Sequence, residues 1–104
     1  MDKVQALAIS LPYIHEAFKK EATMVVVDKE TETVQAYLPG KGLNVGYQSG
    51  QKINADDQNI VLGLRGEKPN VIIPKEVYGI EFNAFAFPIK EGTKVIGAIG
   101  FGVP

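Results

Sequence analysis

Two adjacent apolar runs near the end of the chain, residues 82–89 and 95–101, constrain the fold more than any other stretch. The polar link between them, 90–94, contains Gly92, which can take the positive φ that a tight turn requires. This pattern predicts a β-hairpin. Both runs are apolar at even and odd positions, whereas an antiparallel strand with one wet face alternates apolar with polar side chains. We therefore expect the hairpin at the centre of a sheet that is covered on both faces.

The N-terminal segment, residues 1–20, is expected to supply one cover as a helix. Its apolar residues are spaced by three and four, as on one side of a helix: Val4, Leu7, Ala8, Leu11, Ile14, Ala17 and Phe18. Pro12 falls inside this stripe, where proline removes a backbone hydrogen bond. Ser10 could cap a second helix that has Pro12 in its first turn. The sequence thus leaves open a kinked helix or two short helices that meet near Ser10.

The middle of the chain predicts three more strands and a second helix. Residues 24–27 and 33–38 are strand-like and are joined by a polar turn, and residues 71–73 form a strand that Pro74 stops. The glycine-rich segment 41–52 is expected to be a loop with room for a short helical turn. No strand–helix–strand alternation appears, so we predict an α+β domain with a five-stranded antiparallel sheet.

The second helix is expected to begin at Asn54, which is a good N-cap. Asp56 and Asp57 would then lie in its first turn, where the helix dipole favours negative charge. Gly66 is placed to end it. Adjacent helical residues point about 100° apart, so the two aspartates are interpreted as helix-start acids rather than as a metal-binding pair or an acid–base pair.

Length and composition limit the domain count and the classes of partner. The chain has 104 residues and a net charge of -1, so we expect a single domain over 1–104, with the sheet and its other helices in 23–102. Its single arginine, Arg65, argues against nucleic acid as the main partner. With no cysteine, disulfides and thiolate metal sites are excluded. The absence of a signal-peptide pattern or a long apolar run predicts a cytoplasmic protein without a membrane partner.

Other chemical motifs are weak. His15 is the only histidine, and we interpret it as a partly buried, hydrogen-bonded residue of the helix–sheet contact rather than as a haem ligand. Gly40, Gly42 and Gly46 have the wrong spacing for a dinucleotide-binding loop, so loop flexibility explains them better. No cofactor is expected.

The chain resembles a known family in several motifs. They are Ile73-Pro-Lys-Glu-Val-Tyr-Gly-Ile80 leading into Phe82, Phe87-Pro-Ile-Lys90, and Val95-Ile-Gly-Ala-Ile-Gly-Phe-Gly102, with weaker agreement at 27–28, 37–41, 50 and 53. They are similar to the small PAS-like, Cache-related sensor domains at the front of soluble bacterial methyl-accepting chemotaxis transducers. The resemblance implies helices on one face of the sheet that enclose a small-molecule pocket, and an N-terminal helix on the other. The link 90–94 is shorter than in that family, and the usual output module lies outside this sequence.

The resemblance also directs attention to pocket residues. We expect the ligand site to combine polar-tipped side chains with apolar walls. The polar-tipped residues are Tyr37, Arg65, Tyr78 and Asn83, and the walls include Phe85 and Phe87. Arg65 would suit a carboxylate ligand, although a solvated arginine at a helix end is an equal alternative. Gly97, Gly100 and Gly102 would let either a ligand or the N-terminal helix approach the last strand, and the helix is preferred for Gly100 and Gly102.

The expected function is that of a non-enzymatic, ligand-sensing input domain of a bacterial chemotaxis-type signalling protein. A homodimer through the N-terminal helix is expected as well, because its apolar stripe is long for so small a domain. The alternative is a ligand-free dimerisation or interaction module of the same fold. An enzyme is the weakest hypothesis, because the sequence offers no convincing set of nucleophile, base and orienting residue.

Overall fold

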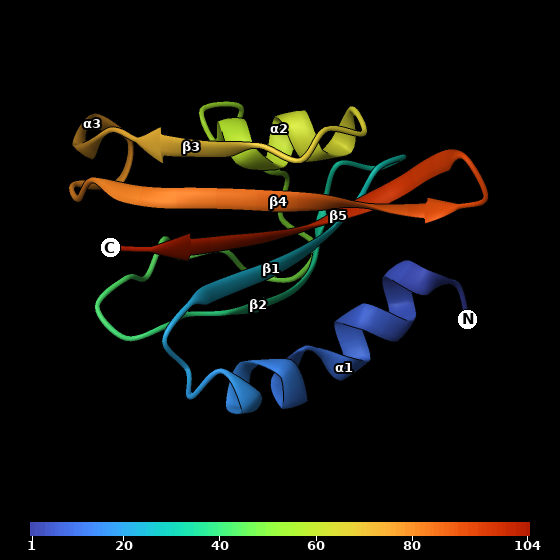
Figure 1. The fold of residues 1–104 in the computed structure, drawn as a ribbon, viewed down its shortest axis with the longest axis horizontal. Coiled ribbons are helices and arrows are strands. Elements are labelled where there is room, and N and C mark those ends of the chain that lie inside the picture. The colour runs from blue at the N-terminus through green and yellow to red at the C-terminus, as the bar shows by residue number, and fades with distance from the viewer.

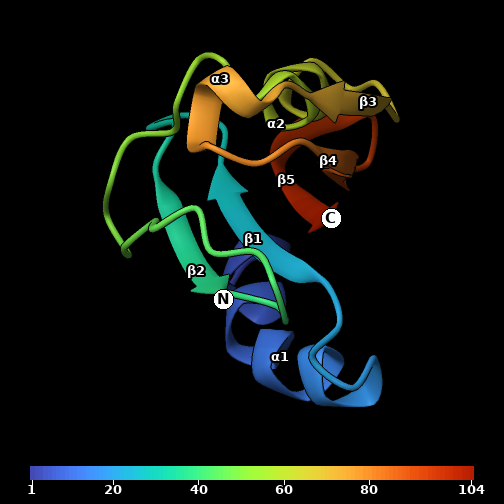
Figure 2. The same ribbon diagram turned by 90° about the vertical axis from the view of Figure 1, so that its left-hand side faces the viewer.

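The computed structural model describes residues 1–104 as one α+β domain (Figure 1). Its elements are α1 (Lys3–Ala17), β1 (Thr23–Asp28), β2 (Val34–Leu38), α2 (Gln58–Leu64), β3 (Asn70–Ile73), α3 (Lys75–Tyr78), β4 (Phe82–Glu91) and β5 (Lys94–Val103). The strands form one sheet in the order β2-β1-β5-β4-β3, with every neighbouring pair antiparallel. Helix α1 lies on one face, and α2 and α3 lie on the other (Figures 1 and 2). The predicted fold class is therefore confirmed.

The β4–β5 hairpin occupies the predicted position in the sheet. Strand β5 is the central strand, and β4 lies between β5 and β3. The loop between the two strands is Gly92-Thr93, and Gly92 has φ +60°. Because an L side chain rarely adopts that conformation, glycine makes this short connection accessible.

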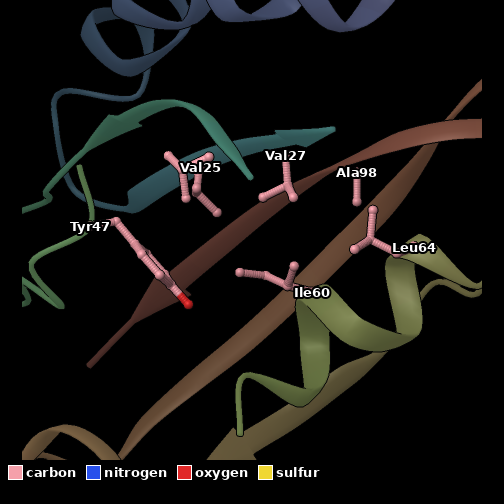
Figure 3. Packing of buried hydrophobic residues seen from close by; sticks show 7 residues of the cluster. Val25, Val27, Tyr47, Ile60, Leu64 and Ala98 are labelled. Carbon is pink, nitrogen blue, oxygen red and sulfur yellow. The ribbon is translucent and has the colours of Figure 1, made fainter. Parts of the chain in front are cut away.

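Strand alternation divides the hairpin into a face of small side chains and a face of large ones. On the α2 side lie Ala84, Ala86, Ala98, Gly100 and Gly102. Gly63 of α2 packs so closely on this face that a Cβ there would lie 3.1 Å from Ala86 Cβ. Ile60 and Leu64 of α2 point from the helix toward Val25, Val27 and Ala98, and Tyr47 completes the cluster (Figure 3).

The α1 side of the same strands carries the large apolar side chains. Val4 and Leu11 of α1 pack with Met24, Val26, Ile89 and Ile99 in a cluster of buried residues. Gly97 of β5 belongs to this side, because a Cβ there would lie 2.7 Å from Val4 Cγ2. The preference for Gly100 and Gly102 as the helix-contacting glycines is therefore wrong; they have the opposite parity, and Gly97 takes that role.

Helix α1 is one continuous helix that contains Pro12, so the alternative of two short helices is wrong. Its N-cap is Asp2, whose carboxylate accepts from Gln5 N while Gln5 Oε1 accepts from Asp2 N, and this capping box replaces the expected cap at Ser10. Pro12 lies on the exposed side, and the packing of the opposite side onto the sheet compensates for the hydrogen bond that Pro12 lacks.

Helix α2 begins later than predicted. Asn54 caps a turn instead, with its Oδ1 accepting from Asp56 N at 2.9 Å, and Asp57 becomes the N-cap residue. Gly66 follows the helix with φ +93°, as expected of a terminating glycine. The one-turn helix α3 was not predicted, and the loop 41–52 contains no helical turn. None of the helices is long and apolar enough to cross a membrane.

Candidate functional site

A small cavity of about 30 Å³ lies over the α2 side of β1 and β5. Its walls come from β1, β2, the loop before α2, the start of α2, β4 and β5: Thr23, Val25, Tyr37, Leu43, Val45, Tyr47, Asp57, Asn59, Ile60, Phe82, Gly100, Phe101 and Gly102. A void of this kind needs about 10–15 Å³ to hold one water molecule, so there is room for very few. The cavity therefore admits a very small polar group as it stands.

Asp57 is the only acidic residue of the cavity wall, and it is 2% exposed. Its Oδ2 accepts hydrogen bonds from the hydroxyls of Tyr47 and Tyr78, the latter at 2.7 Å. Tyr47 OH in turn accepts from Asn54 N at 2.8 Å, which ties the turn before α2 to the site. Burial raises the pKa of the Asp57 carboxyl above its ordinary value, although the two hydroxyl donors act in the opposite direction.

The two tyrosines are held as hydrogen-bond donors. Burial, joined by the hydrogen bond and charge of Asp57, raises the pKa of Tyr78 to about 12, and that of Tyr47 is raised further. Both hydroxyls therefore stay protonated at neutral pH. Their oxygens are 3.4 Å apart, so Asp57, Tyr47 and Tyr78 form one compact polar cluster.

A second set of hydrogen bonds fixes the loop that covers the cavity. Tyr37 OH donates to Asn44 Oδ1 and accepts from Val45 N, both at 2.8 Å. Thr23 Oγ1 donates to Leu43 O at 2.7 Å and accepts from Gly40 N at 2.9 Å. The loop is thus anchored to β2 and β1 by side chains that also line the cavity.

Glycines of β5 leave the space that the cavity occupies. A Cβ at Gly100 would lie 3.1 Å from Val25 Cγ1 and 3.3 Å from Ile60 Cγ1. A Cβ at Gly102 would lie 3.0 Å from Leu43 Cδ2 and 3.2 Å from the Phe82 ring. A side chain at either position would therefore occupy space beside the cavity.

The structure brings together two of the six residues that the sequence indicated for the ligand site. Tyr37 lines the cavity, and Tyr78 contacts it through the hydrogen bond to Asp57. Arg65 is exposed at the C-cap of α2, outside the cavity wall. It therefore does not offer a carboxylate partner inside the cavity.

The other three expected residues point to the α1 side of β4, because strand alternation places them opposite Phe82 and Ala84. Phe85 stacks on Phe101 with 4.9 Å between ring centroids, Phe87 is 45% exposed, and Asn83 is exposed. Sequence parity predicted two different faces but could not say which one would line a pocket.

Sequence reasoning missed the residues at the centre of the site. Tyr47 lies in the segment 41–52 that is expected to be a loop, Asn59 is not among the expected site residues, and Asp57 is interpreted as a helix-start acid. Asp57 does occupy the N-cap position, but its carboxylate makes no capping hydrogen bond and binds the tyrosines instead. The glycine-rich sequence around Tyr47 carried no signal that its hydroxyl meets Asp57.

His15 lies at the helix–sheet contact, as predicted, and is more deeply buried than expected, at 5% exposure. Its Nε2 has no hydrogen-bond partner, so the expected hydrogen bond at that atom is absent. The residue lies on the face opposite the cavity and does not contribute to it.

Comparisons with known proteins point to one fold. No family model matches the chain. The putative sensory transducer protein YfmS of Bacillus subtilis is 26% identical over 102 residues, which span 97% of this chain and 35% of that protein. The chain therefore covers about a third of the length of this curated relative.

Solved sensor domains have a similar structure. The sensor domain of the Vibrio cholerae histidine kinase DctB matches with TM-score 0.67 and 14% identity over 96% of this chain and 37% of that chain. The Escherichia coli DcuS sensor domain matches with TM-score 0.59 and 20% identity over 96% of this chain and 65% of that chain. The chain thus has the α+β fold of PAS-like sensor domains, in agreement with the resemblance seen in the sequence.

Proposed function

We propose that this chain is a sensory input domain of a signal-transduction protein, and that it binds a small molecule in the cavity beside Asp57. The observation that carries the proposal is a buried polar cluster next to the small cavity over the α2 side of β1 and β5. Buried polar groups are normally satisfied within the protein, and those that line a cavity are candidates for ligand recognition. The fold and the similarity to a putative sensory transducer support the same role.

The sheet offers a route from the cavity to α1. Val25 and Gly100 line the cavity, while their strand neighbours Met24, Val26 and Ile99 pack against α1. Because packed interiors are dense and transmit displacement, a ligand that moves β1 or β5 also shifts the side chains against which α1 packs. The signal would leave through α1 and the end of β5, near the two termini (Figure 1).

Native mass spectrometry of the purified domain, followed by a thermal-shift screen of metabolites, tests the proposal. We expect a retained adduct or a saturable rise in Tm, because a ligand that binds only the folded state stabilises it. The Gly102→Ala variant should weaken that response, since its Cβ would crowd Leu43 and Phe82 beside the cavity. A screen without any adduct or stabilisation would contradict ligand binding.

Within this proposal the domain is non-enzymatic and belongs to a cytoplasmic, chemotaxis-type protein. The cavity wall combines Asp57 with tyrosines, Thr23 and Asn59, and no histidine, cysteine or lysine lines it. Incubation with generic esters and phosphates is expected to give no turnover. Turnover that disappears in Asp57→Asn would overturn the non-enzymatic role. For the chemotaxis-type role, a fusion of the domain to the output half of a known transducer should respond to the identified ligand.

A second candidate function, dimerisation through α1, is favoured by an apolar row on the outer side of that helix. Ile9, Tyr13 and Phe18 are 60%, 78% and 63% exposed. Residues four apart lie on the same side of a helix, so Ile9 and Tyr13 form an apolar row on the outer side of α1, and Phe18 is the exposed C-cap residue that follows the helix. A helix pair formed through this row would make a symmetric homodimer.

Analytical ultracentrifugation tests the dimer. We expect self-association at high protein concentration and its loss in Tyr13→Glu, with Glu16→Gln on the same helix as the control. A wild-type chain that stays monomeric throughout would exclude this interface. A dimer that forms while the metabolite screen finds no ligand would favour the ligand-free interaction module.

A further inference from the structure

The hydroxyl groups around the cavity are already used within the protein. Tyr37 donates to Asn44, Tyr47 donates to Asp57, and Thr23 donates to the carbonyl of Leu43. A hydroxyl has a single hydrogen to donate. None of these groups is therefore free to donate to a ligand without breaking an existing hydrogen bond.

The free capacity of the cavity wall consists mainly of acceptors. Both hydrogen bonds of Asp57 fall on Oδ2, which leaves Oδ1 without a partner from the protein. Asn59 is 6% exposed, and its Nδ2 donates to Phe85 O at 3.3 Å, which leaves Oδ1 free together with one amide hydrogen. The two free oxygens, Asp57 Oδ1 and Asn59 Oδ1, therefore favour a ligand that donates hydrogen bonds.

The charge of the cavity wall also favours a ligand that donates hydrogen bonds. Asp57 is the only acidic residue lining the cavity, and no lysine, arginine or histidine lines it. A carboxylate or phosphate would be buried beside Asp57 without a counter-charge, which is strongly unfavourable. A cation would instead neutralise the buried carboxylate.

We propose that the cavity binds the head group of a primary ammonium compound, whose N–H groups donate to Asp57 Oδ1 and Asn59 Oδ1. The inference rests on the proposed function, since it names the class of ligand for the same cavity. The aromatic rings of Tyr37, Tyr47 and Phe82 in the wall favour a cation as well. A volume of about 30 Å³ accepts an ammonium head group, whereas the body of a larger ligand requires the covering loop to move.

Titration with alkylammonium ions tests the inference. Methyl-, ethyl- and propylammonium chloride are added to the purified domain at pH 7.5, with sodium chloride at equal ionic strength and sodium acetate and propionate as anionic probes. Binding is followed by Tm and by amide chemical shifts in ¹⁵N–¹H NMR spectra. We expect saturable shifts at Tyr47, Asp57 and Asn59 with the ammonium ions, and none with the carboxylates.

Two matched variants identify the group that carries the charge. Asp57→Asn is expected to weaken ammonium binding by about 10- to 100-fold, because it removes a charge-assisted hydrogen bond. Asp56→Asn, at the exposed neighbouring position, should bind as the wild type does. If Asp57→Asn does not fold, Gly100→Ala keeps Asp57 while it narrows the cavity, and it should weaken propylammonium more than methylammonium.

Three results would overturn the inference. Saturable binding of carboxylates without binding of ammonium ions would reject the ligand class and leave the proposed sensory function intact. Ammonium binding that Asp57→Asn and Gly100→Ala both leave unchanged would place the cation elsewhere. No response to any alkylammonium ion would reject the ammonium class, and the metabolite screen then decides separately whether the cavity binds another ligand.

Discussion

The two faces of the β4–β5 hairpin are built from alternating residues of the same strands, yet one packs on α1 through large apolar side chains and the other lies beside a cavity with a polar cluster. The α1 face carries Phe85, Ile89, Ile99 and Phe101; the last three pack in the cluster with α1, and Phe85 stacks on Phe101. The α2 face carries alanines and glycines, which leave room for a helix, a covering loop and the side chains of both. Side-chain size, rather than polarity, separates the two faces.

The difference shows how a sheet that is apolar throughout can hold a polar site. None of the polar groups of the cluster comes from the hairpin itself: Asp57 belongs to the start of α2, Tyr47 to the loop and Tyr78 to α3. The small residues of β5 let these groups approach the sheet. A face that packs on α1 and a face beside a polar cavity thus coexist one residue apart.

The largest expected effect on stability comes from removing a large side chain from the contact between α1 and the sheet. Leu11 is 0% exposed, and Leu11→Ala should lower the free energy of unfolding by about 2–5 kcal/mol, because the surrounding side chains cannot close the cavity that the substitution leaves. Ile60→Ala, on the cavity side, should cost less, since its void joins an existing cavity that water can enter. Urea unfolding of both variants measures these losses of stability. A larger loss for Ile60→Ala than for Leu11→Ala would contradict the expected difference between the two faces.

A smaller effect is expected from adding a methyl group to each face. At Gly97 the new Cβ would lie 2.5 Å from Val27 O, so Gly97→Ala should destabilise the domain by about 1–3 kcal/mol. At Gly100 it would meet only side-chain atoms at 3.1 Å or beyond, and the change in stability should stay within about 1 kcal/mol. Equal losses in the two variants, measured by thermal unfolding, would mean that both faces are equally tight.

On the cavity face, Asp57 should make a pH-dependent contribution to stability. The pKa of Asp57 is raised in the folded protein above its ordinary value of 3.8, so the folded state binds the proton more tightly than the unfolded state. Its stabilising contribution is complete below pH 3.8 and is lost as the pH rises through the folded pKa. Relative to Asp57→Asn, the wild type should therefore lose stability from about pH 4 upward, as urea unfolding at several pH values would show. A relative gain would contradict the raised pKa.

The smallest effect is expected at the open edge of the α1 face. Phe87 is 45% exposed and touches Phe85 and Phe101 edge-on. Phe87→Ser should change the free energy of unfolding by less than about 1 kcal/mol. A clearly larger loss in urea unfolding would show that this part of the face is covered more tightly than its exposure indicates.

The sequence by itself determined the elements and their class. The two apolar runs with Gly92 predicted the central hairpin, the spacing of three and four predicted α1, and Pro74 and Gly66 marked the ends of β3 and α2. These features depend on local patterns, which neighbouring residues encode directly. The double cover followed from them, because a sheet that is apolar on both faces must be buried on both, whereas the strand order did not.

Only the tertiary structure decided which face holds the site and which residues form it. Alternation defines two faces but assigns neither to a partner, so Phe85 and Phe87 were placed in the pocket although they lie opposite. Asp57 meets tyrosines 10 and 21 residues away in the chain, and no local pattern specifies that contact. It arises when small residues on β5 let α2, the loop and α3 pack together over one side of the sheet.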